Sequence, residues 1–420
     1  MTLAHALRPE TVATAAAPGA APGTAPARPA LAIARLVLKD FRCYREAAIE
    51  TDGRPVVLTG PNGAGKTNLL EAISFLAPGR GLRRARLAEV ERRPAAPEAG
   101  PEPGPWAVAA RLKDRHGETV ELGTGRDGAA GETERRLIKL DGQFQRGQSA
   151  LAEHVQLVWL TPQMDRLFLD GAGERRRFLD RMVYGFDPEH AARLNAYDHA
   201  LRERARLLQG DLPAMPAGTG RDAWLAGLEE QMAGLGVAIA AARRELLRRL
   251  MATEAEQAAF PAADLALTGE LDRALDEGRP ALEAEDWLRA RLAGSRRLDA
   301  ETGGAELGPQ KSDLAVAHRG RGRPARDCST GEQKALLIAL VIAFARALAA
   351  ERGAAPLLLL DEVAAHLDET RRQALFAELL ALGAQAWLTG TDAGLFGGLG
   401  AKAQYFAVEE ARLAPARPPQ

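Results

Sequence analysis

The stretch Gly60-Pro61-Asn62-Gly63-Ala64-Gly65-Lys66-Thr67 constrains the fold of this chain more than any other. It matches the pattern G-x-x-x-x-G-K-[ST] at every fixed position. Apolar residues at 56–58 predict a short buried strand before it, and residues 68–73 predict the start of a helix after it. The glycines let the backbone wrap closely around a polyphosphate, and the helix N-terminus adds partial positive charge there. The stretch therefore predicts a nucleotide-binding loop.

Two side chains at the end of this loop have predicted roles. Lys66 is expected to reach the β- and γ-phosphates of ATP, and the Thr67 hydroxyl to ligate Mg²⁺. A glycine-rich turn without a ligand is the alternative, which the combination of strand, glycines and Lys-Thr pair disfavours. The predicted nucleotide-binding residues of this half are Gly60, Pro61, Asn62, Gly63, Ala64, Gly65, Lys66, Thr67 and Asn68.

A second half of the same site is predicted near the C-terminus. Four leucines at 357–360 predict a buried strand of a parallel sheet, followed by Asp361 and Glu362. Asp361 is expected to hold Mg²⁺, and Glu362 to polarise the attacking water as a catalytic residue together with Lys66. A core strand that ends in an acidic turn is common by itself, but the phosphate loop upstream favours the catalytic interpretation.

The segment Ser329-Thr330-Gly331-Glu332-Gln333 precedes that strand, with a long apolar helix between them. Taken alone, Ser329 and Glu332 fit a helix capping box. The order of the segments resembles that of ABC-type ATPases, and residues 365–368 resemble their D-loop. The resemblance implies that Ser329 and Gly331 contact ATP held by a second copy, so the chain should form an ATP-dependent homodimer. Where many relatives place a switch histidine, this chain has Thr389-Gly390-Thr391-Asp392.

These segments predict an α/β fold, an ABC-type P-loop ATPase head with an inserted, mostly helical lobe. Period-3.6 apolar spacing between 173 and 294 predicts the lobe, with helices too short for a long coiled-coil arm. The expected domains are a disordered tail at 1–29, the N-terminal half of the head at 30–172, the lobe at 173–300, the C-terminal half at 301–412 and a tail at 413–420.

Composition narrows the function classes. The formal net charge of −1 argues against a protein that binds nucleic acid electrostatically over its whole surface, but not against a local basic patch. The apolar run at 335–345 is too short to span a membrane and predicts a buried helix, so no membrane partner is expected. Two cysteines without metal-binding spacing favour a reducing, cytoplasmic location.

The chain most resembles the RecF family. Residues 38–44 before the loop, residues 60–68, the basic segment 78–83 and residues 174–180 all match family stretches. Residues 307–314 resemble the family's G-P-H-R-D-D-L with three changes. The resemblance implies a slow, DNA-stimulated, switch-like ATPase that binds DNA at single-stranded gaps and duplex junctions. It also implies partnership with RecR and RecO in repair, replication and SOS induction, near the nucleoid.

Several residues keep more than one interpretation. Arg80, Arg83 and Arg84 are candidate DNA contacts, or a solvated charged loop. The arginines at 175–177 line the nucleotide or bind within the lobe. Gln163 is a Q-loop equivalent or a turn residue. For the whole protein, the alternative is an SMC-like, ATP-gated scaffold without direct DNA binding, and a transporter-type ATPase is disfavoured by the long insertion between Lys66 and Ser329.

Overall fold

The computed structural model describes residues 31–93, 104–114, 116–127, 135–210, 220–253 and 259–419. The tail predicted at 1–29 lies outside these residues. The chain divides into two compact units. We call residues 1–164 and 345–420 the head unit, and residues 165–344 the lobe unit. The predicted lobe at 173–300 is therefore shorter at both ends than the compact unit that contains it.

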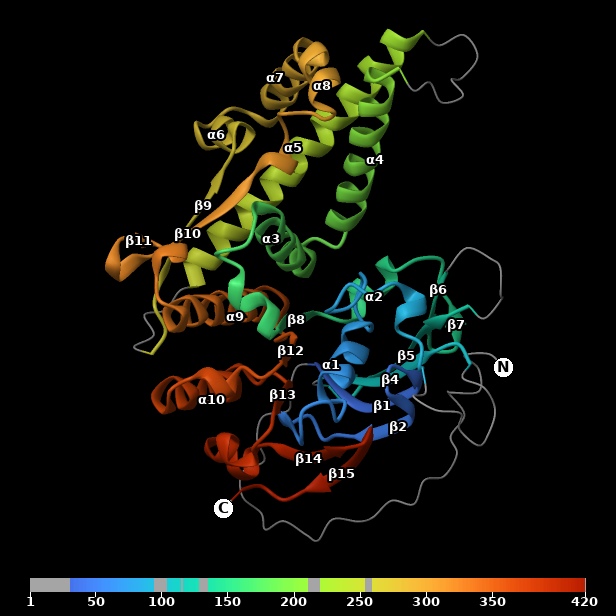
Figure 1. Cartoon of the computed structure of the whole chain (residues 1–420), viewed down its shortest axis with the longest axis vertical. Helices are drawn as coiled ribbons and strands as arrows, with labels where there is room; N and C mark the ends of the chain where they lie inside the picture. Colours follow the sequence, from blue (N-terminus) through green and yellow to red (C-terminus); the bar gives the residue numbers. More distant parts are fainter. Residues whose placement is uncertain are drawn as a thin grey trace. The chain divides into compact units, whose positions relative to one another are not determined.

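A six-stranded sheet, mostly parallel, carries both predicted halves of the nucleotide site in the head unit (Figure 1). Its strand order is β15-β14-β3-β13-β12-β8, and only β15 runs antiparallel to its neighbour. The strands are β3 (Val56–Thr59), β8 (Leu157–Leu160), β12 (Leu357–Leu360), β13 (Ala386–Gly390), β14 (Gln404–Glu409) and β15 (Arg412–Ala416). Because β3 and β12 both flank β13, the loops that follow these three strands meet at one edge of the sheet.

The strand β15 corrects one prediction. Residues 413–420 were expected to form a tail, whereas 412–416 pair with β14 through five residue pairs. Pro415 fits this position because β15 is an edge strand, where a missing N–H group breaks no interior ladder.

A second sheet of the head unit is antiparallel, in the order β2-β1-β4-β5-β6-β7. Its strands are β1 (Leu31–Phe41), β2 (Tyr44–Glu50), β4 (Ala107–Asp114), β5 (Thr119–Arg126), β6 (Arg136–Leu140) and β7 (Gln143–Phe144). The helix α1 (Lys66–Ser74), which follows the phosphate loop, contacts β1 of this sheet and β13 of the other. One buried apolar cluster joins α1 and both sheets, and it fixes the direction in which α1 begins.

The half-buried Arg136 on β6 holds the other end of α1. Its guanidinium donates to the carbonyl oxygens of Phe75, Ala77 and Gly79, and also to the Thr124 hydroxyl. The carbonyls at a helix C-terminus carry partial negative charge, which suits a cation. Burial lowers the pKa of Arg136 to about 9, so the group remains charged at neutral pH.

Most of the lobe unit is helical, as predicted. Its main helices are α3 (Ala172–Phe186), α4 (His190–Leu208), α5 (Arg221–Thr253), α6 (Glu270–Asp276), α7 (Ala281–Gly294) and α8 (Arg296–Thr302). The 33-residue α5 is packed against α3, α4 and α7. An apolar cluster centred on α4, α5 and α7 forms the core of the unit.

The lobe unit also contains a three-stranded sheet that the helical periodicity did not predict. Its order is β11-β10-β9, with β9 (Ala263–Thr268), β10 (Asp313–His318) and β11 (Arg323–Pro324). Buried and exposed residues alternate strictly along β9, which is the signature of a half-buried strand. The strand is too short to stand out among the surrounding helical segments.

The helix α9 (Thr330–Arg352) contains the unit boundary between Phe344 and Ala345. It is long and apolar enough to cross a membrane, with a mean hydropathy of 1.8, but 78% of its most apolar window is buried inside the structure. It is therefore the buried helix that the run at 335–345 predicts.

Candidate nucleotide-binding site

The phosphate loop joins β3 to α1, as predicted, and its three glycines all have positive φ values, a backbone conformation that other residues rarely adopt. Gly60 has φ +152°, and a Cβ atom there would lie 2.1 Å from the Val408 carbonyl oxygen. Gly65 has φ +116°, and its Cβ atom would lie 2.8 Å from the Tyr44 hydroxyl. Gly63 has φ +81°, and apart from its chain neighbours no atom of the described residues lies within 4 Å of the corresponding point there. The loop is therefore packed against β14 and β2 on one side and open at its middle.

Lys66 lies inside the curve of this loop. Its Nζ atom donates hydrogen bonds to the carbonyl oxygens of Gly60 at 2.7 Å and Pro61 at 3.0 Å. Only 4% of the residue is exposed. Burial lowers the pKa of Lys66, while Glu362 and Asp361 raise it in part. The ammonium group is thus held beside the loop, where two nearby carboxylates stabilise its positive charge.

Thr67 and Asp361, 294 positions apart in the chain, are in direct contact. The Thr67 hydroxyl lies 3.0 and 3.1 Å from the two carboxylate oxygens of Asp361 and donates to them. Asp361 is 4% exposed, and burial raises the pKa of its carboxyl group. The two residues predicted to share a magnesium ion therefore converge at the edge of the sheet.

Thr389 on β13 completes this cluster. Its hydroxyl donates to Asp361 Oδ1 at 2.7 Å and accepts the backbone N–H of Glu362 at 2.9 Å. Glu362 has φ +53°, an uncommon conformation for a residue with a side chain. Thr389 thus fixes both the carboxylate of Asp361 and the backbone from which the Glu362 side chain extends. Sequence reasoning expected a Thr or Asp at 389–392 to take the place of the switch histidine, but it did not single out Thr389.

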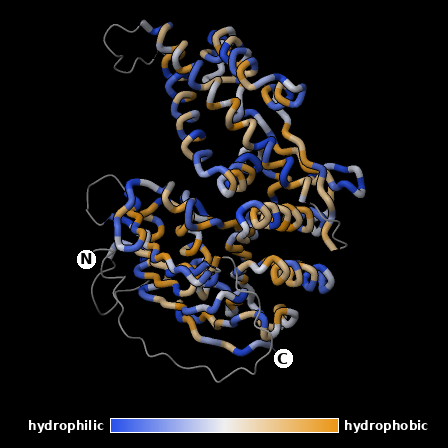
Figure 2. Tube along the Cα trace, turned by 180° about the vertical axis from the view of Figure 1, so that it is seen from behind, coloured by the Kyte–Doolittle hydropathy of each residue, from blue (hydrophilic) through white to orange (hydrophobic). Residues whose placement is uncertain are grey.

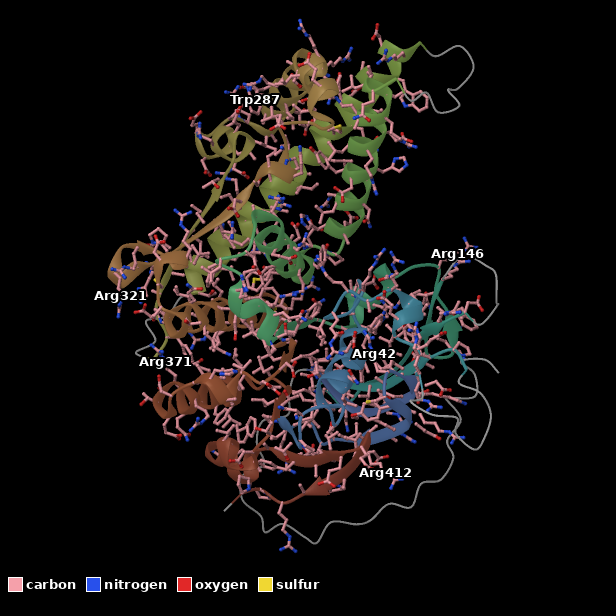
Figure 3. The ribbon with its side chains drawn as sticks, viewed as in Figure 1. Arg42, Arg146, Trp287, Arg321, Arg371 and Arg412 are labelled. Carbon is pink, nitrogen blue, oxygen red and sulfur yellow. The ribbon has the colours of Figure 1, made fainter. Side chains whose placement is uncertain are left out.

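Asn68 takes part in a second network that the sequence did not predict. Its amide donates to Cys43 Sγ at 3.1 Å and its carbonyl accepts from Arg83 at 2.8 Å. Arg83 also binds the fully buried Glu71 at 3.1 Å, whose other partner is Arg42 at 2.7 Å. Figure 3 labels Arg42 beside α1. The network ties the segment after α1 to the first turns of that helix.

The three arginines predicted as DNA contacts differ in their surroundings. Arg83 is held by Asn68 and Glu71, although 35% of its side chain is exposed. Arg80 is exposed and makes no hydrogen bond or ion pair with the described residues. Arg84 is exposed and has φ +56°. Their contact with DNA stays a prediction.

The predicted signature residues belong to the lobe unit, at the start of α9. The Glu332 carboxylate accepts hydrogen bonds at 2.9 Å from both the N–H and the hydroxyl of Ser329. The Glu332 N–H faces the Ser329 hydroxyl at 3.4 Å, which completes the capping box. Gly331 is exposed on the first turn. Ser329 thus already holds one anionic group, the carboxylate of Glu332.

The arginines at 175–177 bind within the lobe unit. Arg175 forms two 2.7 Å hydrogen bonds to the Asp313 carboxylate, and Arg176 donates to the Ser312 carbonyl at 2.6 Å. Arg177 pairs with Glu174. Of the two interpretations of these arginines, the structure supports the one within the lobe. Gln163 is exposed in a short 3-10 turn at 162–166, so it stays open between Q-loop and turn residue.

A family model described as the RecF/RecN/SMC N terminal domain matches residues 32–396. Proteins called DNA replication and repair protein RecF are 48% identical over 385 residues in Allorhizobium ampelinum and 49% over 389 residues in Caulobacter vibrioides. Each alignment covers 91% of this chain, with 98% and 97% of the relative. The chain belongs to the RecF family.

A solved structure of the recombination mediator protein RecF-ATPrS in the RecFOR pathway has the same fold. Its TM-score is 0.76 at 21% sequence identity, and the superposition covers 93% of this chain and 99% of that one. The predicted family and the predicted fold class, an ABC-type ATPase head with an inserted helical lobe, are therefore both confirmed. The predicted nucleotide-binding segments at 60–68 and 357–362 meet at the sheet edge.

Proposed function

We propose that this protein is an ATP-driven, DNA-binding recombination mediator that acts at single-stranded gaps and duplex junctions. The observation that carries the proposal is the convergence of Thr67, Asp361 and Thr389 beside the phosphate loop. A cluster of this kind serves a nucleotide polyphosphate, and close relatives are named for DNA replication and repair. The proposed role covers repair, replication and SOS induction, at a cytoplasmic, nucleoid-associated location.

The oxygens at the sheet edge fit Mg²⁺. Thr67 supplies a hydroxyl and Asp361 a carboxylate, and these hard ligands suit a magnesium ion that keeps several waters and binds phosphate oxygens. The open middle of the loop at Gly63 leaves room for those phosphates. When bound, the ion would neutralise charge that develops on the transferred phosphoryl group.

The chain's own residues perform the remaining tasks in this proposal. Lys66 neutralises the β- and γ-phosphates from within the loop. Glu362, held by its backbone on Thr389, orients and polarises the attacking water. Ser329 and Gly331 of a second copy close the site on the γ-phosphate. ATP binding thus favours the dimer, and slow hydrolysis releases it.

DNA contact is assigned to the exposed segment that contains Arg80, Arg83 and Arg84, and we expect DNA to stimulate hydrolysis. The proposed protein partners are RecR- and RecO-like mediators, since a solved structure with the same fold is named for the RecFOR pathway. Phosphate contacts of this type position a protein on nucleic acid without reading its sequence.

The test is binding to a labelled gapped duplex, with and without ATP and Mg²⁺. The Glu362→Gln variant should bind tightest with ATP, because the ATP dimer forms but hydrolysis is blocked. The Lys66→Ala variant should lose the effect of ATP. Failure of the wild type to bind DNA in every nucleotide state would contradict the proposal and favour an SMC-like scaffold without direct DNA binding.

A further inference from the structure

Four arginines gather on one exposed hairpin of the lobe unit. We call residues 319–326 the arginine hairpin. It joins β10 to the start of α9 through β11 and two short 3-10 turns. Its arginines are Arg319, Arg321, Arg323 and Arg326, all exposed. The hydropathy colouring draws this hairpin strongly hydrophilic, at the right edge of the view (Figure 2).

The arginines differ in how far their charge is neutralised. Arg319 binds the Asp264 carboxylate at 2.7 Å and the Ala263 carbonyl at 3.1 Å, which anchors the hairpin to β9. Among the described residues, the Arg326 guanidinium has only a long, 3.8 Å contact with its neighbour Asp327, and its side chain is 70% exposed. The backbone of Arg323 pairs with β10, but its side chain makes no hydrogen bond or ion pair within the described part of the chain. The hairpin therefore presents uncompensated positive charge to solvent.

Arg321 connects this charge to the signature segment. Its guanidinium lies 2.6 Å from Glu332 Oε1, while Oε2 of the same carboxylate accepts the hydroxyl and N–H of Ser329. Arg321 is 55% exposed, whereas Glu332 is 12% exposed. The hydrogen bonds from Ser329 lower the pKa of Glu332, and Arg321 adds to this effect. One carboxylate is thus shared between the arginine hairpin and the start of α9.

We propose that the arginine hairpin binds the phosphate backbone of a nucleic acid and that Arg321 transmits this binding to Ser329 through Glu332. Half-exposed ion pairs contribute little to stability, so a dense row of phosphates can compete for Arg321. Loss of Arg321 frees the Glu332 carboxylate to move. The Ser329 hydroxyl and N–H then become available for another anion.

This inference rests on the proposed function, since it supposes that Ser329 serves the ATP of a second copy. It places a second phosphate-backbone contact on the lobe unit, separate in sequence from the segment with Arg80. The partner is a nucleic acid rather than an acidic protein, because a continuous polyphosphate is the ligand that guanidinium groups bind best as a row.

The binding test uses the Arg323→Gln, Arg326→Gln double variant of the full chain and a fluorescent gapped duplex. Affinity is measured over a range of salt concentrations. Loss of two phosphate contacts should make the log–log salt slope shallower by about 1.8. The control is Arg297→Gln on α8, whose side chain is 94% exposed and pairs with Glu301 alone among the residues that the structure describes. It should behave as the wild type does.

The outcomes separate this inference from the proposed function. If the wild type binds no DNA under any condition, the proposed function itself is contradicted. A wild type that binds DNA, with a double variant of equal affinity and equal slope, overturns the inference alone. Equal weakening in the Arg297→Gln control also overturns it, because the effect would then be non-specific surface charge.

The link to the signature has its own readout. ATP turnover is measured with and without DNA at a concentration that saturates each variant. The Arg321→Gln variant should respond less to DNA than the wild type does, whereas Arg297→Gln should keep the full response. An undiminished DNA response in Arg321→Gln overturns transmission through Glu332. Equal melting temperatures of the two variants would show that misfolding does not explain the difference.

Discussion

At the scale of single residues, the contacts of the Thr389 hydroxyl lead to a prediction about Mg²⁺ affinity that the phosphate loop alone does not give. Thr389→Val keeps the shape but removes the donor to Asp361 and the acceptor for the Glu362 N–H. Groups that orient metal ligands affect metal affinity by about 10–100-fold, so the apparent Mg²⁺ affinity in ATP turnover should fall by that factor. Thr389→Ser, which retains the hydroxyl, should restore it.

A magnesium titration of ATP turnover checks this prediction, with the melting temperature measured beside it. If Thr389→Val lowers the melting temperature but leaves the magnesium midpoint unchanged, the hydroxyl is only a packing group. A shifted midpoint that the serine variant corrects identifies it as a positioning group for Asp361.

Thr389 also shows where sequence reasoning about the site stops. Lys66, Thr67 and Asp361 follow from local patterns, since each stands at a fixed place in a short motif. The role of Thr389 depends on β13 lying between β3 and β12, which no local pattern reveals. In the same way, Glu71 reads as an ordinary helix residue until the fold buries it between Arg42 and Arg83.

At the scale of elements, the junction of β9, α6 and the segment before β10 carries a buried carboxylate. Asp272 on α6 is fully buried, and neither of its carboxylate oxygens makes a hydrogen bond within the described residues. Burial raises its pKa, although the neighbouring Ser312 and Arg243 act in the opposite direction. The folded state therefore favours the protonated form of Asp272. The stability of the folded protein falls as pH rises through this raised pKa.

Asp272→Asn removes the free-energy cost of keeping a charged carboxylate buried at neutral pH. The variant should gain about 1 kcal/mol of unfolding free energy near neutral pH, and the gain should shrink in acid, where the wild-type acid is already protonated. Urea unfolding at pH 7.5 and pH 4.5 measures the difference. Asp286→Asn on α7, whose side chain is 61% exposed, is the matched control. A gain that is equal at both pH values would contradict the role of the charge.

The strands of this protein differ in how clearly the sequence predicts them. The strands at 56–59 and 357–360 are short apolar runs beside diagnostic motifs, so their type was clear. The strand β9 is amphipathic, six residues long and preceded by a 33-residue helix, so its period-2 pattern was hidden. Its partner is β10, and even the nearest paired residues, Thr268 and Asp313, are 45 positions apart in the chain. Pairing between strands so far apart is set by tertiary packing.

At the scale of the whole molecule, the two halves of the proposed catalytic machinery fall into different compact units. Lys66, Thr67 and Asp361 belong to the head unit, and Ser329 and Gly331 to the lobe unit. A site completed by a second copy predicts complementation between two inactive variants. Lys66→Ala damages the phosphate loop, and Ser329→Arg damages the signature. In a mixed dimer, one composite site carries both defects and the other carries neither.

Each variant alone should therefore hydrolyse ATP at a background rate. When the two are mixed in equal amounts and associate at random, half of the dimers are mixed and each has one intact site. Turnover should then recover to about a quarter of the wild-type rate if the two sites act independently. Mixing either variant with the doubly altered chain is the control, because no intact site can form. Recovery absent from the first mixture would mean that each copy completes its own site, and the dimeric mechanism would have to be abandoned.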